Sequence, residues 1–317
     1  MKANVLALLA AFAFAFGNVL QQKGTLEAPA GGDNPRFLAQ ILRRPVWLAG
    51  GACQISGWVL QAVALDTGSL IVVQSLTAMS LVIALPLGRH FTGQVVTRRV
   101  WLGAAAMVAG IVLFISVGSP QGGTSTPPAS AWWSAGLSAL VLVALLANLG
   151  RHRQGAPRAL LFGAAAGVGF ALQAAVTKVF VTVVGQGASA VLHSWTTYVL
   201  IASALAGFVL QQSALKTGVL APAMASSNAV TLFGSVVFGA TVFGEKLSSG
   251  GGRLAPAIIG LGVALVGIVL LAGAEPPQAS EGVPRLDELP STQAGPVRGS
   301  RPVGAHPRGR DRAGGQG

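Results

Sequence analysis

Long apolar runs separated by short polar segments dominate the chain. Runs of about twenty residues are long enough to cross ~30 Å of hydrocarbon as α-helices. The pattern predicts nine membrane spans, at residues 4–20, 47–65, 69–87, 101–117, 132–149, 160–184, 193–213, 219–243 and 254–272. A cleavable signal peptide is the competing interpretation of the first run. A retained span is favoured because the nearby basic residues cluster after this run.

One stretch of this pattern occurs twice. Residues 57–70 (GWVLQAVALDTGSL) return without a gap as residues 207–220 (GFVLQQSALKTGVL). The positions whose residue type recurs are Gly57, Val59, Leu60, Gln61, Ala64, Leu65, Thr67, Gly68 and Leu70. Weaker matches extend the repeat to four spans, one linking span and four spans again. Because four crossings return the chain to its starting side, the linking span inverts the second set, as in many secondary transporters.

The domain organisation follows from this repeat. The membrane body is predicted at residues 1–273, with repeat one at 1–118, the linking span at 132–149 and repeat two at 158–273. Residues 274–317 are rich in Pro, Gly, Ser and Arg and are predicted to be a disordered cytoplasmic tail. The predicted fold class is an all-α polytopic membrane protein with about nine transmembrane helices in a 4+1+4 inverted repeat. Only 9% of the residues are charged, which agrees with a membrane protein.

The net charge of +12 reflects an asymmetry between the two sides of the membrane. Basic residues crowd the side that holds the loops at 22–45, 88–99, 150–158 and 214–217 and the C-terminal tail. Because cytoplasmic loops carry excess Lys and Arg, the N-terminus is predicted outside and the C-terminus inside a plasma membrane. The basic loops and tail would face anionic inner-leaflet lipid, and no nucleic-acid partner is expected.

No catalytic constellation is present in the sequence. A Gly-x4-Gly-Lys-Ser/Thr phosphate loop is absent, and the four histidines lack metal-ligand spacing. Cys53 is the single cysteine, which excludes an internal disulfide. The sequence therefore predicts neither an enzyme nor a bound metal or cofactor.

Polar residues inside the predicted spans are the candidate solute contacts, because they tend to face the interior of a helix bundle. The candidates are Asn18, Gln21, Gln61, Gln74, Gln173, Thr177, Lys178, Gln211 and Asn228. Hydrogen bonding between helices is the competing interpretation for each uncharged member. For Lys178, two alternatives stay open: its ammonium snorkels to the membrane surface, or it lines a cavity.

Two carboxylates end spans on the predicted outer side. Asp66 ends the second span and Glu245 the eighth, and we expect both to be exposed caps or surface groups with a candidate role in ion recruitment. Pro222, at the start of the eighth span, predicts a kinked or loosened helix there. The small-residue runs 103–110 and 163–169 predict close contacts between helices.

Several motifs resemble a known transporter superfamily. The duplicated multi-span unit, Gly244-Glu245 at the end of a span and the closing helix at 262–270 look like the drug/metabolite transporter superfamily with its EamA-type repeat. Gly17, the run Leu20-Gln21-Gln22-Lys23-Gly24 and Trp47-Leu48-Ala49-Gly50 resemble its NIPA-like magnesium-transporter branch. The resemblance implies secondary transport or export of a small solute.

The sequence favours a secondary, non-ATP transporter of a small organic metabolite or drug by alternating access. Magnesium transport is the alternative, although magnesium is usually bound through one or two carboxylates, which the span interiors lack. A non-transporting membrane scaffold or partner subunit is the alternative of another class. A homo-oligomer is left open.

The topology is testable with reporter fusions. A reporter active only outside the cytoplasm should be silent when fused after Gly273, whereas a cytoplasm-active reporter at the same point should work. The opposite result would overturn both the orientation and the inversion inferred from it.

Overall fold

The computed structural model describes residues 2–26, 44–92, 96–124, 126–215, 217, 220–247 and 254–272. Nine helices among these residues are long and apolar enough to cross a membrane. They are α1 (Lys2–Leu26), α3 (Pro45–Thr67), the pair α4 (Leu70–Ala78) and α5 (Ser80–Thr92), α6 (Arg98–Gly118), α7 (Ala129–Arg151), α8 (Gly155–Val184), α10 (Trp195–Leu215), α11 (Leu220–Thr241) and α12 (Leu254–Ala272). The chain is an all-α polytopic membrane protein, and the nine predicted spans are all found among these described residues.

The observed helices differ from the predicted spans mainly at their ends. A separate short helix, α9 (Ala188–His193), precedes α10, which therefore begins at Trp195 rather than at His193. The predicted tail at 274–317 and most of the predicted loop at 22–45 lie outside the described residues.

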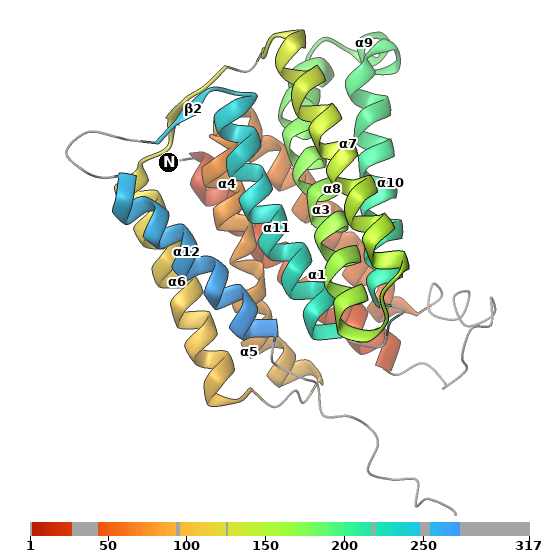
Figure 1. Cartoon of the computed structure of the whole chain (residues 1–317), viewed down its shortest axis with the longest axis vertical. Helices are drawn as coiled ribbons and strands as arrows, with labels where there is room; N and C mark the ends of the chain where they lie inside the picture. The colour runs from red at the N-terminus through yellow and green to blue at the C-terminus, as the bar shows by residue number, and fades with distance from the viewer. Residues whose placement is uncertain are drawn as a thin grey trace, which may run out of the picture. The chain divides into compact units, whose positions relative to one another are not determined.

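The first four spans are α1, α3, the α4–α5 pair and α6, and the last four are α8, α10, α11 and α12. Within the first group, α1 packs against α3 and α5; within the last, α8 packs against α10 and α11. Figure 1 shows α12 lying along α6, so that the two groups meet at this pair. They meet again where α4 contacts α11. The linking span α7 packs mainly on α8.

Glycines bring α6 and α12 together at backbone distance. A Cβ atom on Gly267 of α12 would lie 2.7 Å from the carbonyl oxygen of Gly103 on α6. A Cβ on Gly110 of α6 would likewise lie 2.6 Å from the carbonyl oxygen of Gly260 on α12. The predicted role of the runs 103–110 and 163–169 in close packing is confirmed, since Gly163 and Gly167 meet α11 equally closely.

The helix break in this bundle is at Met79, not at Pro222. The N–H of Met79 donates to the carbonyl of Leu76, three residues back, at 3.1 Å, and this separates α4 from α5. Pro222, by contrast, lies in the first turn of a continuous α11. The prediction of a loosened helix at Pro222 is therefore wrong, because backbone N–H groups in a first turn have no intrahelical partner to lose.

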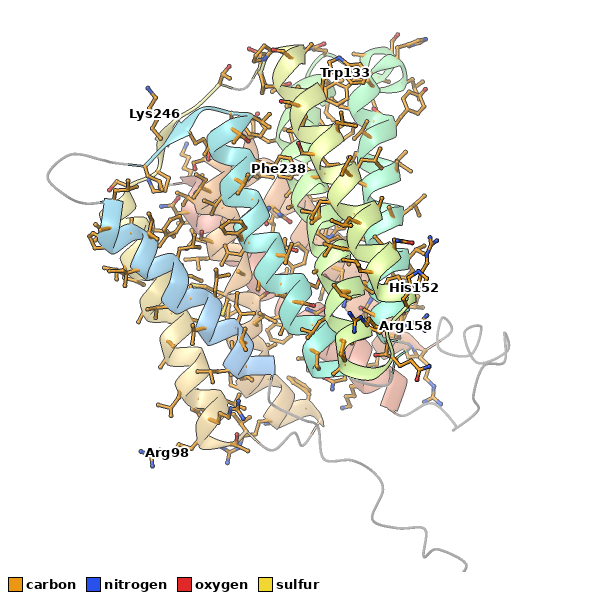
Figure 2. All side chains as sticks on the ribbon, in the orientation of Figure 1. Arg98, Trp133, His152, Arg158, Phe238 and Lys246 are labelled. Carbon is orange, nitrogen blue, oxygen red and sulfur yellow. The ribbon has the colours of Figure 1, made fainter. Side chains whose placement is uncertain are left out.

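A two-residue ladder lies at one end of the helices. The strand β1 (Gln121–Gly122), after α6, pairs antiparallel with β2 (Glu245–Lys246), after α11. Figure 2 shows Lys246 and Trp133 at this end, and Arg98, Arg158 and His152 at the opposite end. We call these the ladder end and the arginine end. Figure 1 shows that α1 starts at the ladder end, where Ala3 lies beside Gly68.

Two glycines of α12 offer a matched test of the α6–α12 contact. Gly267→Ala should destabilise the protein by about 1–3 kcal/mol, because the new methyl group would overlap the backbone of Met107 and Gly103. Gly262→Ala, in the same helix, should be neutral or stabilising because nothing lies within 4 Å of its Cβ position. Thermal unfolding of the purified variants in detergent measures the difference. Equal effects at the two sites would contradict this packing.

Candidate functional site

Glu245 lies in β2 just after α11, and its side chain is completely buried. Its carboxylate accepts four hydrogen bonds. The donors are the hydroxyl of Ser69 at 2.8 Å, the backbone N–H of Leu70 at 2.6 Å, the backbone N–H of Ile71 at 3.0 Å and the ammonium of Lys178 at 2.7 Å. The first three lie at the N-terminus of α4, where unpaired N–H groups and the helix dipole favour an anion. Glu245, which follows a helix of the last four spans, therefore caps the N-terminus of α4, which belongs to the first four.

Lys178, on α8, is the cationic partner of this carboxylate. Its side chain is only 8% exposed, and its Nζ atom lies 2.7 Å from Oε1 of Glu245. The ammonium also lies 4.9 Å from the centroid of the Phe243 ring, a cation–π distance. The ion pair and the ring thus replace the water that an isolated ammonium would need in the membrane.

The main chain and small residues close tightly around the carboxylate. Gly123, in the loop after β1, has a φ of 95°, and a Cβ atom there would lie 2.8 Å from Cγ of Glu245. On the α11 side, a Cβ on Gly239 would lie 2.5 Å from Ile71 and 2.8 Å from Oε2 of Glu245. Only glycine at these two positions allows the loop and α11 to approach the carboxylate so closely.

Aromatic rings cover the ion pair. The ring of Trp132 packs edge-on against that of Phe243 at 5.9 Å and against that of Trp195 at 5.3 Å. Phe243 in turn lies over the Lys178 ammonium. Loop, rings and ion pair together exclude solvent from the Glu245 carboxylate.

Two expectations from the sequence change here. The expectation that Glu245 is an exposed cap or surface group is wrong, because the fold brings the N-terminus of α4 and Lys178 to its carboxylate. Neither of the two alternatives for Lys178, snorkelling to the membrane surface or lining a cavity, describes its position, since its ammonium is paired within the protein. Asp66, in contrast, is exposed at the end of α3.

A second polar region lies one helical turn deeper, where α4 meets α11. The two helices run antiparallel, with Ile71 against Gly239, so Gln74 and Ser235 come to a similar depth. Both residues are buried, at 6% and 0% exposure. Among the described residues, Gln74 Nε2 and Ser235 Oγ lack a hydrogen-bond partner. A desolvated polar group without a partner costs about 1–3 kcal/mol, so each is suited to an external partner.

The remaining predicted residues are distributed over several helix pairs. On α1, the Asn18 amide oxygen accepts a hydrogen bond from Gln54 of α3, and Gln21 packs over Gly50. On α8, Gln173 is buried. Its backbone carbonyl accepts a hydrogen bond from the Thr177 hydroxyl at 2.8 Å.

A third group lies between α10 and α11. The Gln211 amide donates to the sulfur of Met224 at 3.2 Å, and its carbonyl oxygen has no partner among the described residues. Asn228 donates to the Met224 backbone carbonyl within its own helix.

Gln61 lies apart from these groups and is partly buried on α3. The structure therefore does not gather all the predicted residues into one site.

Sequence reasoning missed several parts of the site. Ser69, directly before an apolar run, carries a readable N-cap signature, and its hydroxyl accepts from the N–H of Val72. Ser235 and Gly239 carry no such signal, because small residues are common in membrane helices. Their importance comes from what packs opposite them.

The described residues do not assemble a metal centre. No group of three or more His, Cys, Asp and Glu side chains lies close enough together to hold an ion in the part of the chain that the structure describes. The four donors on Glu245 also leave its carboxylate poorly placed to bind a cation in this conformation. The site can bind a carboxylate through N–H, hydroxyl and ammonium groups, and Glu245 fills that role.

Glu245 has several hydrogen-bond donors, whereas Lys178 has Glu245 as its anionic partner, and this difference leads to a stability prediction. Lys178→Met leaves Glu245 three of its four hydrogen bonds, whereas Glu245→Gln leaves the buried ammonium without its anion. Losing one partner of a buried pair costs about 3–5 kcal/mol, so we expect Glu245→Gln to approach that range and Lys178→Met to fall below it.

Thermal unfolding in detergent measures both changes, with Asp66→Asn as the exposed carboxylate control. The double variant should be less destabilised than the sum of the single variants. Additive effects would show that the two side chains are not coupled.

Comparison with known proteins places the chain among relatives. No family model matches it, and no solved structure matches it. The probable magnesium transporter NIPA9 of Arabidopsis thaliana is 25% identical over 268 residues, which cover 80% of this chain and 77% of NIPA9.

A bacterial protein is more similar in sequence than NIPA9. The uncharacterized protein Cgl0250/cg0304 of Corynebacterium glutamicum is 31% identical over 255 residues, which cover 78% of this chain and 87% of that protein. At this identity and coverage, the chain belongs to the same protein family as the Corynebacterium glutamicum protein.

Proposed function

We propose that this protein is a secondary transporter that moves a small polar organic solute across the membrane by alternating access. The observation that carries the proposal is the pair of buried, unpartnered and uncharged polar groups on Gln74 and Ser235. They lie on two helices, α4 and α11, through which the first four spans meet the last four. A solute passing between the two groups of spans would complete their hydrogen bonds.

The alternating-access part of the proposal rests on the inverted repeat. Offsets from the sequence repeat match Gly103 with Gly260 and Gly110 with Gly267. A two-fold relation would then convert the Gly103–Gly267 contact into the Gly110–Gly260 contact, and both contacts are present. This reciprocity supports two related halves that meet at α6 and α12, the arrangement in which one half rocks against the other.

The helix break at Met79 supports a solute site close to Gln74. The N–H that an unbroken helix would give to the Ser75 carbonyl is used elsewhere, because Met79 donates to Leu76. Discontinuous helices near the middle of the membrane often carry transporter sites, since they free backbone groups for the solute. Here the break follows Gln74 by little more than one turn.

The polar groups available favour an organic solute. Ligand sites for small organic molecules combine apolar walls with a few placed polar contacts. Gln74 offers an amide donor and Ser235 a hydroxyl that donates or accepts. Gln173, Gln211 and the other uncharged residues predicted from the sequence extend the candidate solute pathway beyond this pair.

Magnesium is the second candidate, and one observation favours it: the similarity to the probable magnesium transporter NIPA9. Against it stands the chemistry of the ion, which is usually bound through carboxylates and retained water. The buried carboxylate of Glu245 is already engaged by four donors. Magnesium transport would therefore need a conformation in which Glu245 is released.

The proposed location is the plasma membrane, with the ladder end outside and the arginine end inside. Arg98 and Arg158 lie at the arginine end, in agreement with the tendency of basic residues to remain cytoplasmic. The N-terminus would then be outside and the C-terminal tail inside.

Flux into liposomes tests the function. Purified protein should take up at least one of a panel of radiolabelled solutes: zwitterionic amino acids, small carboxylates, nucleobases and an aromatic cation. Gln74→Met should lower that uptake about tenfold, since one lost hydrogen bond to a desolvated solute is worth ~1–3 kcal/mol. Its thermal stability should be unchanged or higher, because no protein partner is lost.

The same substitution at an exposed glutamine, Gln212→Met, is the matched control and should transport like the parent protein. A magnesium indicator trapped in the liposomes provides the second arm. Magnesium flux without flux of any organic solute would show that the transported substrate is the ion. No flux in either arm would favour the scaffold interpretation.

A further inference from the structure

The carboxylate of Glu245 joins two groups of helices that alternating access requires to move apart. The hydroxyl of Ser69 and the N–H groups of Leu70 and Ile71 belong to the first four spans. Glu245 and Lys178 belong to the last four. This contact also lies at one end of the helices, beside the ladder that joins β1 to β2.

The contact is closed to solvent in this conformation. The Glu245 side chain is 0% exposed and that of Lys178 is 8% exposed. Gly123 covers the carboxylate from the loop after β1, where the N–H of Thr124 also donates to the carbonyl of Phe243 at 2.8 Å. Among the described residues, a solute at the depth of Gln74 therefore has no open route along this contact.

The chemistry of the contact suits a closure that opens repeatedly. Apolar residues of similar size often stabilise a buried position as well as an ion pair does, so stability alone does not explain the charges. An apolar contact would also be costly to expose to water. Charged side chains and helix N–H groups, in contrast, are readily hydrated once water enters. The contact between the ion pair and α4 is thus compatible with a dry, closed state and with a wet state in which α4 is released.

We infer that Glu245, Lys178 and the N-terminus of α4 form a latch that closes the ladder end and releases when that end opens. The inference rests on the proposed alternating-access function and adds the residues that control one of its two gates. Release frees Glu245 from α4 and admits water to the region of Ser75, Gln74 and Ser235, one turn deeper. The arginine end is not controlled by this latch.

Thiol accessibility tests the latch without any knowledge of the solute. Cys53 is the single cysteine, so Cys53→Ser gives a background for one reporter, Ser75→Cys, at a position that is 0% exposed below the latch. A charged, membrane-impermeant maleimide is added to right-side-out or to inverted vesicles. The labelling rate at position 75 then reports access from each side separately.

Weakening the latch should accelerate labelling from one side only. We expect Glu245→Gln and Lys178→Met to raise that rate about tenfold or more, since losing a buried charge partner shifts a two-state equilibrium by at least this factor. Ser69→Ala removes one of four donors and should produce a smaller rise. Asp66→Asn makes the same chemical change as Glu245→Gln at an exposed carboxylate and should leave the rate unchanged.

A second reporter separates opening from unfolding. Ser227→Cys places the thiol at a buried position on α11, where the Ser227 carbonyl lies close to Gly167 of α8, away from the latch. It should stay slow in every variant that opens only the ladder end. The latch is overturned if Glu245→Gln and Lys178→Met leave labelling at position 75 unchanged, or if both reporters accelerate equally from both sides.

The outcome is independent of the flux measurement. Solute uptake with unchanged labelling in the latch variants would refute the latch and leave the transport function standing. Accelerated one-sided labelling without flux of any tested solute would support the latch and count against the proposed solute class.

Discussion

A carboxylate buried at the boundary between two groups of helices must be completely satisfied, and this requirement organises the ladder end of the protein. Glu245 meets it with donors from two helices: the N-terminus of α4, including the Ser69 hydroxyl that caps it, and Lys178 in the C-terminal part of α8. Several neighbouring features follow from it. Gly239 and Gly123 have no side chain because one would occupy the space of the carboxylate or its neighbours. Phe243 and Trp132 exclude water from the pair.

The polar groups of the interior are consistent with this arrangement. Because Lys178 and Glu245 neutralise each other, the deeper region between α4 and α11 is left to uncharged groups such as Gln74 and Ser235. Amides and hydroxyls recognise a solute by the geometry of its hydrogen bonds rather than by its charge. In the transporter that we propose, the charged pair and the uncharged region have separate tasks: the pair joins the two groups of spans, and the uncharged region recognises the solute.

How much of this was visible in the sequence depended on the range of the interactions. The nine spans were predicted because hydrophobic length is a local property that the bilayer imposes on every segment. The tight packing of glycines was likewise expected from the runs of small residues in the sequence. The environment of Glu245 was not, since its partners lie 67 to 176 positions away along the chain. The break at Met79 has no proline or glycine to signal it, whereas Pro222 gave a signal that its place in a first turn made harmless.

The pairing of Lys178 with Glu245 also has an electrical consequence. A charge that moves through the membrane field gains or loses about 2.3 kcal/mol per 100 mV. Among the described residues, Lys178 is a basic residue within a membrane span. Its charge is balanced by the Glu245 carboxylate, 2.7 Å away. When the pair moves as a unit, its net charge is zero. The membrane voltage therefore exerts almost no net force on it, and the voltage sensitivity of a transport cycle would come mainly from the charge of the solute.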